Sequence, residues 1–200
     1  MKKYLIALAI AGSAGIATVG LWADEQEGNE HGEYGGHSTW LAGGRGREEG
    51  AQNGYMKDPR YALYKDECGS CHFAYPPALL PSSSWQHLMR TLSDHFGDDA
   101  ELDPTTTGDI AAYLDRNSAG KVPGDYSERM WRSTRGQAPV RRITETDYFR
   151  GQHHEIPAKM VAGNPEVKSF SRCDACHTGA AQGSFEEHQV HIPGYGRFSD

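Results

Sequence analysis

The sequence predicts a mainly α-helical protein with extensive loops, arranged as two small domains. Segments 84–96 and 143–156 repeat apolar residues at helical spacing, and 103–117 opens with a helix-start signal. No stretch shows the alternation of apolar and polar residues that is typical of a strand. A hydrophobic fraction of 37% with 24 glycines in 200 residues is low for one large core. We therefore expect two domains, 58–120 and 121–200, each centred on one copy of a five-residue motif.

The first segment, 1–23, reads as an export signal peptide. Lys2 and Lys3 precede an apolar run that ends at Ala23, just before the acidic sequence DEQEGNE. A retained membrane anchor is the alternative, although glycines and a serine interrupt the run. Either reading places the rest of the chain outside the cytoplasm, in the periplasm. The net charge of −7 becomes more negative once the two lysines are removed, so nucleic acid is not an expected partner.

The next segment, 24–57, is rich in glycine and charge and has almost no apolar periodicity, so it reads as a flexible tether. It contains His31 and His37. A metal site is one interpretation of this pair, and two solvated histidines in a linker are the simpler one.

All four cysteines lie in two copies of one motif, CGSCH at 68–72 and CDACH at 173–177. A disulfide framework gives no reason for a histidine after each second cysteine. A zinc ribbon also uses two Cys-x-x-Cys pairs, but these are usually separated by about 15–20 residues, whereas here they are a hundred residues apart. Neither copy has the strand-rich context of a thioredoxin-like redox pair. Covalent attachment of haem is the interpretation of the two motifs that remains.

The spacing of the motif suits this chemistry. Two cysteines three positions apart on a helical turn point the same way, so both sulfurs can form thioether bonds to the vinyl groups of one haem. The following histidine then lies beneath the iron as an axial ligand. We therefore expect two covalently attached haem c groups, which also supply the apolar centres that such small domains lack. The residues concerned are Cys68, Cys71, His72, Cys173, Cys176 and His177.

A helix is expected over 84–96, started by a capping box between Ser83 and Gln86 and ended by Gly97. Its apolar face comprises Trp85, Leu88, Met89, Leu92 and Phe96. His95 lies at the edge of this face and is a candidate second axial ligand. The alternative is a histidine that serves as a charge partner at the helix end. His87 lies on the opposite side and is expected to face water, and Met89 is expected to pack in the core.

The second half offers a parallel case. Thr144 is the expected N-cap of a helix in which His153 shares one side with Phe149, whereas His154 faces outward. His153 is thus the better candidate ligand. His188 and His191 are alternatives, because they follow the second motif closely.

From about residue 58 onward the sequence resembles the bacterial periplasmic dihaem cytochrome c family. The runs YPPALLP through HFGDDA and the pattern CxACHxxAxxGxFxE carry this resemblance beyond the haem motifs themselves. The resemblance implies electron transfer without catalysis, from a membrane cytochrome b linked to quinol to a small oxygen-binding monohaem cytochrome c. It also implies low-spin haems with two histidine ligands each, His72 with His95 and His153 with His177, if pairing follows proximity in the chain. A crossed pairing is the alternative.

Two other functions compete with this relay. A dihaem peroxidase-like enzyme would need one labile distal ligand, for which His153 is the candidate. A haem-based sensor would need an output domain, for which the chain has little room.

Charge differs between the two halves. Residues 58–120 carry ten acids and four bases, whereas 121–200 carry ten acids and eleven bases. The acidic half could steer a basic partner cytochrome. Six arginines of the second half could pair with haem propionates or form a solvated basic face; they are Arg129, Arg132, Arg135, Arg141, Arg142 and Arg150.

Overall fold

The computed structural model describes residues 53–198, which all belong to one compact unit, 38–200. The predicted export signal, residues 24–52 of the predicted tether, and His31 and His37 lie outside the described residues. The end of the segment predicted to be flexible is ordered, because Asn53–Lys57 forms a 3₁₀ turn and Tyr55 is buried in the core. None of the helices in the described part of the chain is both long and apolar enough to cross a membrane.

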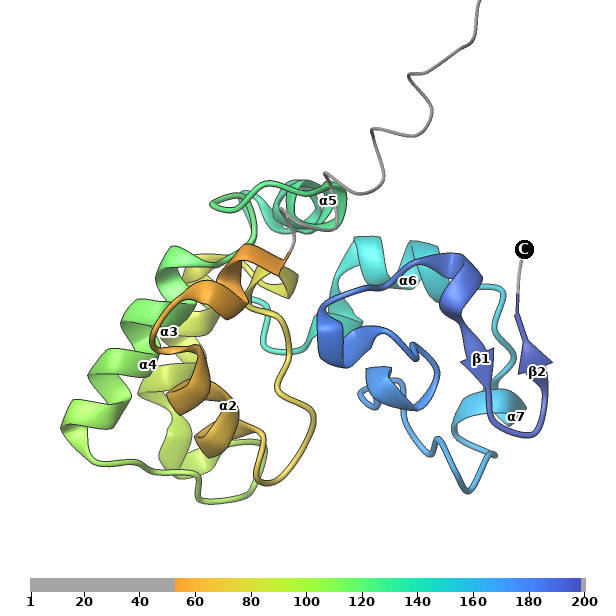
Figure 1. Ribbon diagram of the computed structural model, residues 1–200, viewed down its shortest axis with the longest axis horizontal. Coiled ribbons are helices and arrows are strands. Elements are labelled where there is room, and N and C mark those ends of the chain that lie inside the picture. Colours follow the sequence, from red (N-terminus) through yellow and green to blue (C-terminus); the bar gives the residue numbers. More distant parts are fainter. Residues whose placement is uncertain (1–52, 199–200) are drawn as a thin grey trace, which may run out of the picture. The chain divides into compact units, whose positions relative to one another are not determined.

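The fold is mainly helical, as predicted, with long irregular connections (Figure 1). The α-helices are α2 (Tyr61–Cys68), α3 (Ser82–Arg90), α4 (Pro104–Arg116), α5 (Asp125–Thr134), α6 (Asp147–His153) and α7 (Ala158–Val161). Short 3₁₀ turns connect and follow these helices, including Leu92–Asp94, Ile143–Glu145 and Cys173–Ala175. A small hairpin, β1 (His191–Ile192) and β2 (Gly196–Arg197), pairs antiparallel near the C-terminus. Sequence reasoning did not predict this hairpin, because each strand is only two residues long.

Helix α4 begins as predicted. Asp103 is the N-cap, and its carboxylate accepts hydrogen bonds from the backbone N–H of Thr105 (2.9 Å) and Thr106 (3.1 Å). Pro104 occupies the first helical position. A backbone N–H at this position has no hydrogen-bond partner within the helix, so the N–H that proline lacks costs no hydrogen bond. The buried side of the helix presents Ile110, Tyr113 and Leu114 to α2 and α3.

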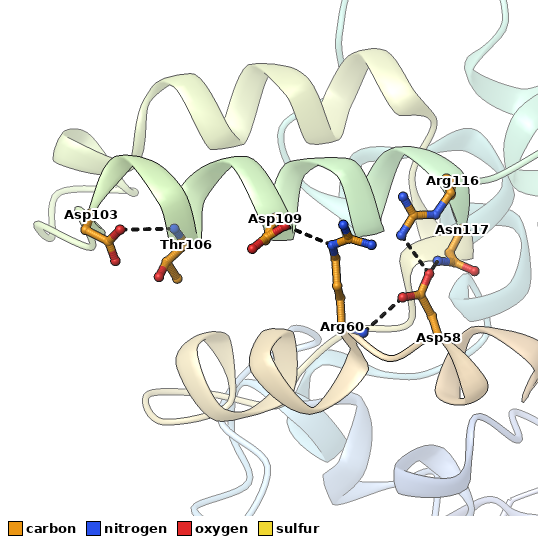
Figure 2. Close-up of polar contacts among 7 residues, drawn as sticks. All are labelled: Asp58, Arg60, Asp103, Thr106, Asp109, Arg116 and Asn117. Atoms are coloured by element: carbon orange, nitrogen blue, oxygen red, sulfur yellow. Dashed lines mark hydrogen bonds and ion pairs between the residues drawn. The ribbon is translucent and has the colours of Figure 1, made fainter.

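A polar clamp ties the start of α2 to the end of α4 (Figure 2). The Asp58 carboxylate accepts hydrogen bonds from the Arg60 backbone N–H (3.0 Å), Arg116 (2.9 Å) and Asn117 (3.4 Å). Arg60 in turn contacts Asp109 of α4 at 2.9 Å. Burial alone would raise the pKa of Asp58, but the hydrogen bonds from Arg60 and Arg116 outweigh it and hold the pKa below its usual value.

The helix expected over 84–96 is shorter than predicted. It begins at Ser82 after Pro81, and Ser83 makes no capping hydrogen bond. Instead, Ser82 bonds to Asp115 of α4, and Gln86 donates to the Ser82 hydroxyl oxygen (3.1 Å). The helix ends at Arg90, because the Thr91 hydroxyl donates back to the His87 carbonyl (3.1 Å) and a 3₁₀ turn follows.

Two further expectations need correction. The N-cap of α6 is Thr146, whose hydroxyl accepts the Phe149 N–H at 3.2 Å, because Thr144 lies within the 3₁₀ turn Ile143–Glu145. Phe96 does not belong to the apolar face, because the helix has already ended, and its side chain is 37% exposed. Met89 packs in the core as expected.

The main apolar core is built almost wholly by the first half of the chain. Its buried members run from Tyr55 to Ala119, and the second half adds only Tyr126, Met130 and Ile143. Four apolar residues of the second half are buried outside this cluster, Val161, Val167, Ala180 and Ile192. The last sixty residues therefore have little protein core of their own.

Candidate functional site

The first site comprises Cys68, Cys71, His72 and His95. Helix α2 ends at Cys68, so the CGSCH motif turns off the end of a helix rather than continuing it. The Ser70 hydroxyl donates to the Glu67 carbonyl at 2.8 Å and holds this turn. The side chains of Cys71 and His72 are exposed, whereas Cys68 is half-buried. Burial, with Glu67 nearby, raises the pKa of the Cys68 thiol to about 11.

The structure brings His95 to His72. Their ring centroids are 6.2 Å apart, and the ring planes differ by 19°. The helical periodicity that singled out His95 does not apply here, because the residue follows a 3₁₀ turn. His95 instead begins a tight turn, in which its N–H donates to the Asp98 carbonyl (2.7 Å) and Asp98 N–H donates back (3.2 Å).

The turn after His95 contains an unusual residue. Phe96 has φ +59° and Gly97 has φ +101°. Glycine adopts such angles readily, but an aromatic residue there is strained. The guanidinium groups of Arg142 and Arg141 lie 4.0 and 5.2 Å from the Phe96 ring centroid. These contacts from the second half offset the strain and fix the loop that carries His95.

The second site comprises Cys173, Cys176, His177 and His153, and these four residues line a cavity of about 200 Å³. His153 is the last residue of α6, and its ring stacks on Phe149 with centroids 3.9 Å apart. His177 lies with its ring centroid 6.1 Å from that of His153. The rest of the cavity wall is largely apolar and aromatic; it includes Tyr126, Met130, Tyr148, Phe170, Phe185 and Ile192. Sequence reasoning did not identify these lining residues, because they come from five separate segments.

The two ring separations fit one metal ion between each pair. A metal–nitrogen distance of about 2.0 Å, plus about 1.1 Å from nitrogen to ring centre on each side, gives about 6.2 Å between centroids. The observed values are 6.2 and 6.1 Å. Each CxxCH motif therefore has one further histidine whose ring lies at about this separation, His95 near His72 and His153 near His177.

Hydrogen bonds define the tautomer of one histidine in each pair. Nδ1 of His72 lies 2.7 Å from the Phe73 carbonyl, and Nδ1 of His153 lies 2.8 Å from the Phe149 carbonyl. A carbonyl only accepts, so Nδ1 carries the proton in both rings and Nε2 carries the lone pair that a metal needs. Nδ1 of His95 and Nδ1 of His177 are buried without a hydrogen-bond partner.

Burial suppresses charge at both sites. It lowers the pKa of His177 to about 4, and the neighbouring His153 adds to this effect. The pKa of His95 is also lowered, first by burial and then by His72. Burial raises the pKa of the Cys173 thiol to about 12, with Asp174 adding to the rise. Burial therefore favours the neutral form of the His95 and His177 imidazoles, which is the form that binds a metal, and the protonated form of the Cys173 thiol.

The other histidines within residues 53–198 do not join either site. His154 is exposed, as predicted, and His188 and His191 are also exposed and do not line the cavity. His87, expected in water, is half-buried on α3. The chain near His191 does fold back on the second motif, because its N–H donates to the Cys176 carbonyl at 2.9 Å.

The donor set fits haem better than the alternatives. All four cysteines, which lie in the described part of the chain, are free thiols. Within residues 53–198, no group of three or more His, Cys, Asp or Glu side chains is arranged to hold a metal ion. At each site two histidine rings lie about 6 Å apart beside two cysteines, and at the second site the wall is apolar. This donor set suits an iron whose remaining ligands come from a porphyrin.

Comparison with known proteins gives a consistent result. The profile of the dihaem cytochrome c family matches residues 64–185. A diheme cytochrome c structure from Shewanella baltica is 42% identical, with a TM-score of 0.58, covering 70% of this chain and 99% of the other. A diheme cytochrome c from Rhodobacter sphaeroides is 41% identical, with a TM-score of 0.55, covering 62% of this chain and 95% of the other. A search of curated proteins finds no match. The chain belongs to the dihaem cytochrome c family, and is thus an electron-transfer protein with two covalently attached haem c groups.

Proposed function

We propose that this protein is a periplasmic electron relay whose two haems are both low-spin and each ligated by two histidines. His72 and His95 ligate the first iron, and His177 and His153 ligate the second. The observation that carries this proposal is the pair of ring separations, 6.2 and 6.1 Å, each at its own CxxCH motif. The same distances favour pairing by proximity over a crossed pairing.

Each haem supplies an iron that accepts and releases one electron. The histidines fill both axial positions, so no position remains for oxygen or peroxide. Hydrogen bonds from Nδ1 of His72 and His153 to backbone carbonyls fix these rings and raise their basicity toward a metal. A methionine ligand opposite a histidine raises the reduction potential of a haem iron. With two histidine ligands on each iron, both haems should have low reduction potentials. These features favour relay over catalysis.

The partners follow from the family resemblance and from charge. A membrane cytochrome b linked to quinol supplies electrons, and a small oxygen-binding monohaem cytochrome c accepts them. The export signal at 1–23 supports a periplasmic location. Of the six arginines, Arg129 and Arg132 form ion pairs along α5 with Asp125 and Glu128. Arg141 and Arg142 lie beside Phe96 in the loop that carries His95, and Arg142 also pairs with Glu145 at 3.7 Å. Arg141 is therefore the candidate partner for a propionate of the first haem.

Ligand replacement tests the proposal. His95→Ala and His153→Ala should each convert one haem to the high-spin state and leave the other low-spin. His87→Ala and His154→Ala are matched controls, because each removes a nearby histidine that does not join a site. Electron paramagnetic resonance and absorption spectra of the haem-loaded variants give the spin states.

Carbon monoxide distinguishes the competing function. The reduced wild-type protein should not bind the gas, whereas the His95 and His153 variants should. Ready binding by the wild-type protein, or one high-spin haem in it, would contradict the relay and support a dihaem peroxidase-like enzyme with a labile distal ligand.

A further inference from the structure

The second histidine of each pair is held by a different part of the fold. His95 is held by its own tight turn with Asp98, whereas His153 is the last residue of the seven-residue helix α6. A helix this short is not stable in water by itself, so its position depends on what anchors its first turn. The residue at that end is Thr146, the N-cap of α6, which is only 2% exposed.

The hydroxyl of Thr146 contacts three separate groups. It donates to the Ile143 carbonyl at 2.8 Å and accepts the Phe149 N–H at 3.2 Å. Its oxygen also lies 3.5 Å from the sulfur of Met130 on α5, and Met130 is likewise 2% exposed. Because these groups are buried, water cannot readily replace the hydroxyl if it is lost. Thr146 therefore ties the start of α6 to the preceding 3₁₀ turn and to α5.

Phe149 connects this anchor to His153. The N–H of Phe149 is the group that Thr146 caps, and the Phe149 carbonyl lies 2.8 Å from Nδ1 of His153. The two rings are stacked, with centroids 3.9 Å apart and planes inclined by 12°. Phe149 therefore sets both the plane of the His153 imidazole and the direction of its Nε2. A shift of the first turn of α6 would move Phe149 and change the 6.1 Å separation between the His153 and His177 rings.

We propose that Thr146 is a positioning residue for the second haem, because it holds α6 where the His153 imidazole reaches the iron in the correct orientation. Thr146 does not line the cavity, so it acts through Phe149 and not by touching the cofactor. This inference rests on the proposed function, because it requires His153 to be an iron ligand.

Three substitutions isolate the role of the hydroxyl. Thr146→Val removes it and nearly preserves the shape of the side chain. Thr146→Ala removes it in a smaller side chain, and so repeats the test if the valine variant does not fold. Thr146→Ser keeps a hydroxyl and should restore wild-type behaviour, because serine is a good N-cap. Asp103→Ala is the matched control, because it removes the N-cap of α4, a helix that contains no histidine.

The first measurement is the apparent affinity of the oxidised, haem-loaded protein for cyanide, which binds an iron only when a histidine has left it. Thr146→Val should raise this affinity at the second haem by about fivefold. The reason is that losing an N-cap raises, by about this factor, the population in which α6 is frayed and His153 is off the iron. The first haem of this variant, and both haems of Thr146→Ser and Asp103→Ala, should keep the wild-type affinity.

The second measurement is the electron paramagnetic resonance spectrum of the same samples without cyanide. The low-spin lines of a haem with two histidine ligands depend on the angle between the two imidazole planes. Thr146→Val should therefore shift the lines of the second haem and leave those of the first unchanged. The His153→Ala variant shows which lines belong to the second haem.

The outcomes separate this inference from the proposed function. Wild-type cyanide affinity and wild-type resonance lines in Thr146→Val and Thr146→Ala would overturn the role of Thr146 and leave the proposed function intact. An equal rise in cyanide affinity in Asp103→Ala would assign the effect to a general loss of stability and would also overturn that role. If both haems of His153→Ala stay low-spin, His153 is not a ligand and the proposed function itself is wrong.

Discussion

The two haem sites use the same motif but sit in different surroundings. The first is attached to a helical core that is complete without a cofactor, and its Cys71 and His72 are exposed. The second has its cysteines and histidines half-buried around an apolar cavity, in a region of short helices and turns (Figure 1). We infer that the haem of the second region also contributes to packing, because it would fill the apolar cavity where the first region has a protein core.

The largest predicted effect comes from removing each haem in turn. Cys173→Ala with Cys176→Ala should remove amide hydrogen-exchange protection across residues 140–198 and cost at least about 3 kcal/mol, the order of losing a large buried apolar group. Cys68→Ala with Cys71→Ala should leave α3 and α4 protected. Equal losses of protection in the two variants would contradict the comparison.

The junction of the two regions gives the next effect. Gly120 has φ +79°, and a Cβ there would lie 2.6 Å from Cγ of Trp131 on α5. Gly120→Ala should therefore lower the free energy of unfolding by about 3 kcal/mol, because alanine is strained in the left-handed backbone conformation and its methyl group overpacks against Trp131. Gly108→Ala is the control, because nothing lies within 4 Å of its added Cβ in α4. That change should stabilise the protein by about 1 kcal/mol in urea unfolding.

The polar clamp of the first region gives a smaller, pH-dependent effect. Asp58→Asn should cost about 1–3 kcal/mol at pH 7, because it weakens hydrogen bonds to a charged carboxylate. The pKa of Asp58 is lowered in the folded protein. Its contribution is therefore present above the unfolded pKa of about 3.9 and is lost as the pH falls through the folded value. The free energies of unfolding of the wild-type protein and of Asp58→Asn, measured by urea titration, should therefore become equal at low pH.

Exposed Asp66 supplies the control for that experiment. Asp66→Asn should leave the pH dependence of wild type unchanged. If the free energies of unfolding of wild type and Asp58→Asn differ by the same amount at pH 7 and at low pH, the charge of Asp58 is not involved.

The smallest predicted effect concerns the acidic first region as a steering surface. Electron delivery to a lysine-rich monohaem cytochrome c should slow by about tenfold as ionic strength rises from low to high, because salt screens the attraction. Neutralising Asp98 and Asp99, which lie in the loop that carries His95, should weaken the salt dependence. A rate of electron delivery that does not respond to ionic strength would rule out steering.

Sequence reasoning identified the chemistry of the sites better than their geometry. Covalent attachment of haem requires a fixed spacing of cysteines and histidine, so CGSCH and CDACH can be recognised in the sequence whatever the local fold. Helix α4 was equally predictable, because Asp103 and Pro104 are a local start signal. The placement of His95 near His72 was correct, but the helix expected to present it ends at Arg90.

Other features depended on contacts between distant segments and could not be predicted. Helix α5 is an exception, because the two ion pairs at i,i+4 spacing along it are a local signal that sequence reasoning did not use. The strained Phe96 is tolerated because arginines from the other half cover its ring. The hydrogen bond from Tyr75 to Ser171 joins residues for which no local pattern exists. The division into haem domains at residue 120 stays a prediction.

His95 is tethered at close range. Two backbone hydrogen bonds close its own turn, and the loop is joined at both ends to packed helices, α3 and α4. If His95 is the second ligand of the first iron, as proposed, a ring that leaves the iron cannot diffuse away, so its effective concentration there is at least of the order of millimolar. A small molecule that competes with His95 for the iron would then have to be present above that concentration or bind more tightly than imidazole. The tether alone would in this way keep the first iron closed to ligands from solution.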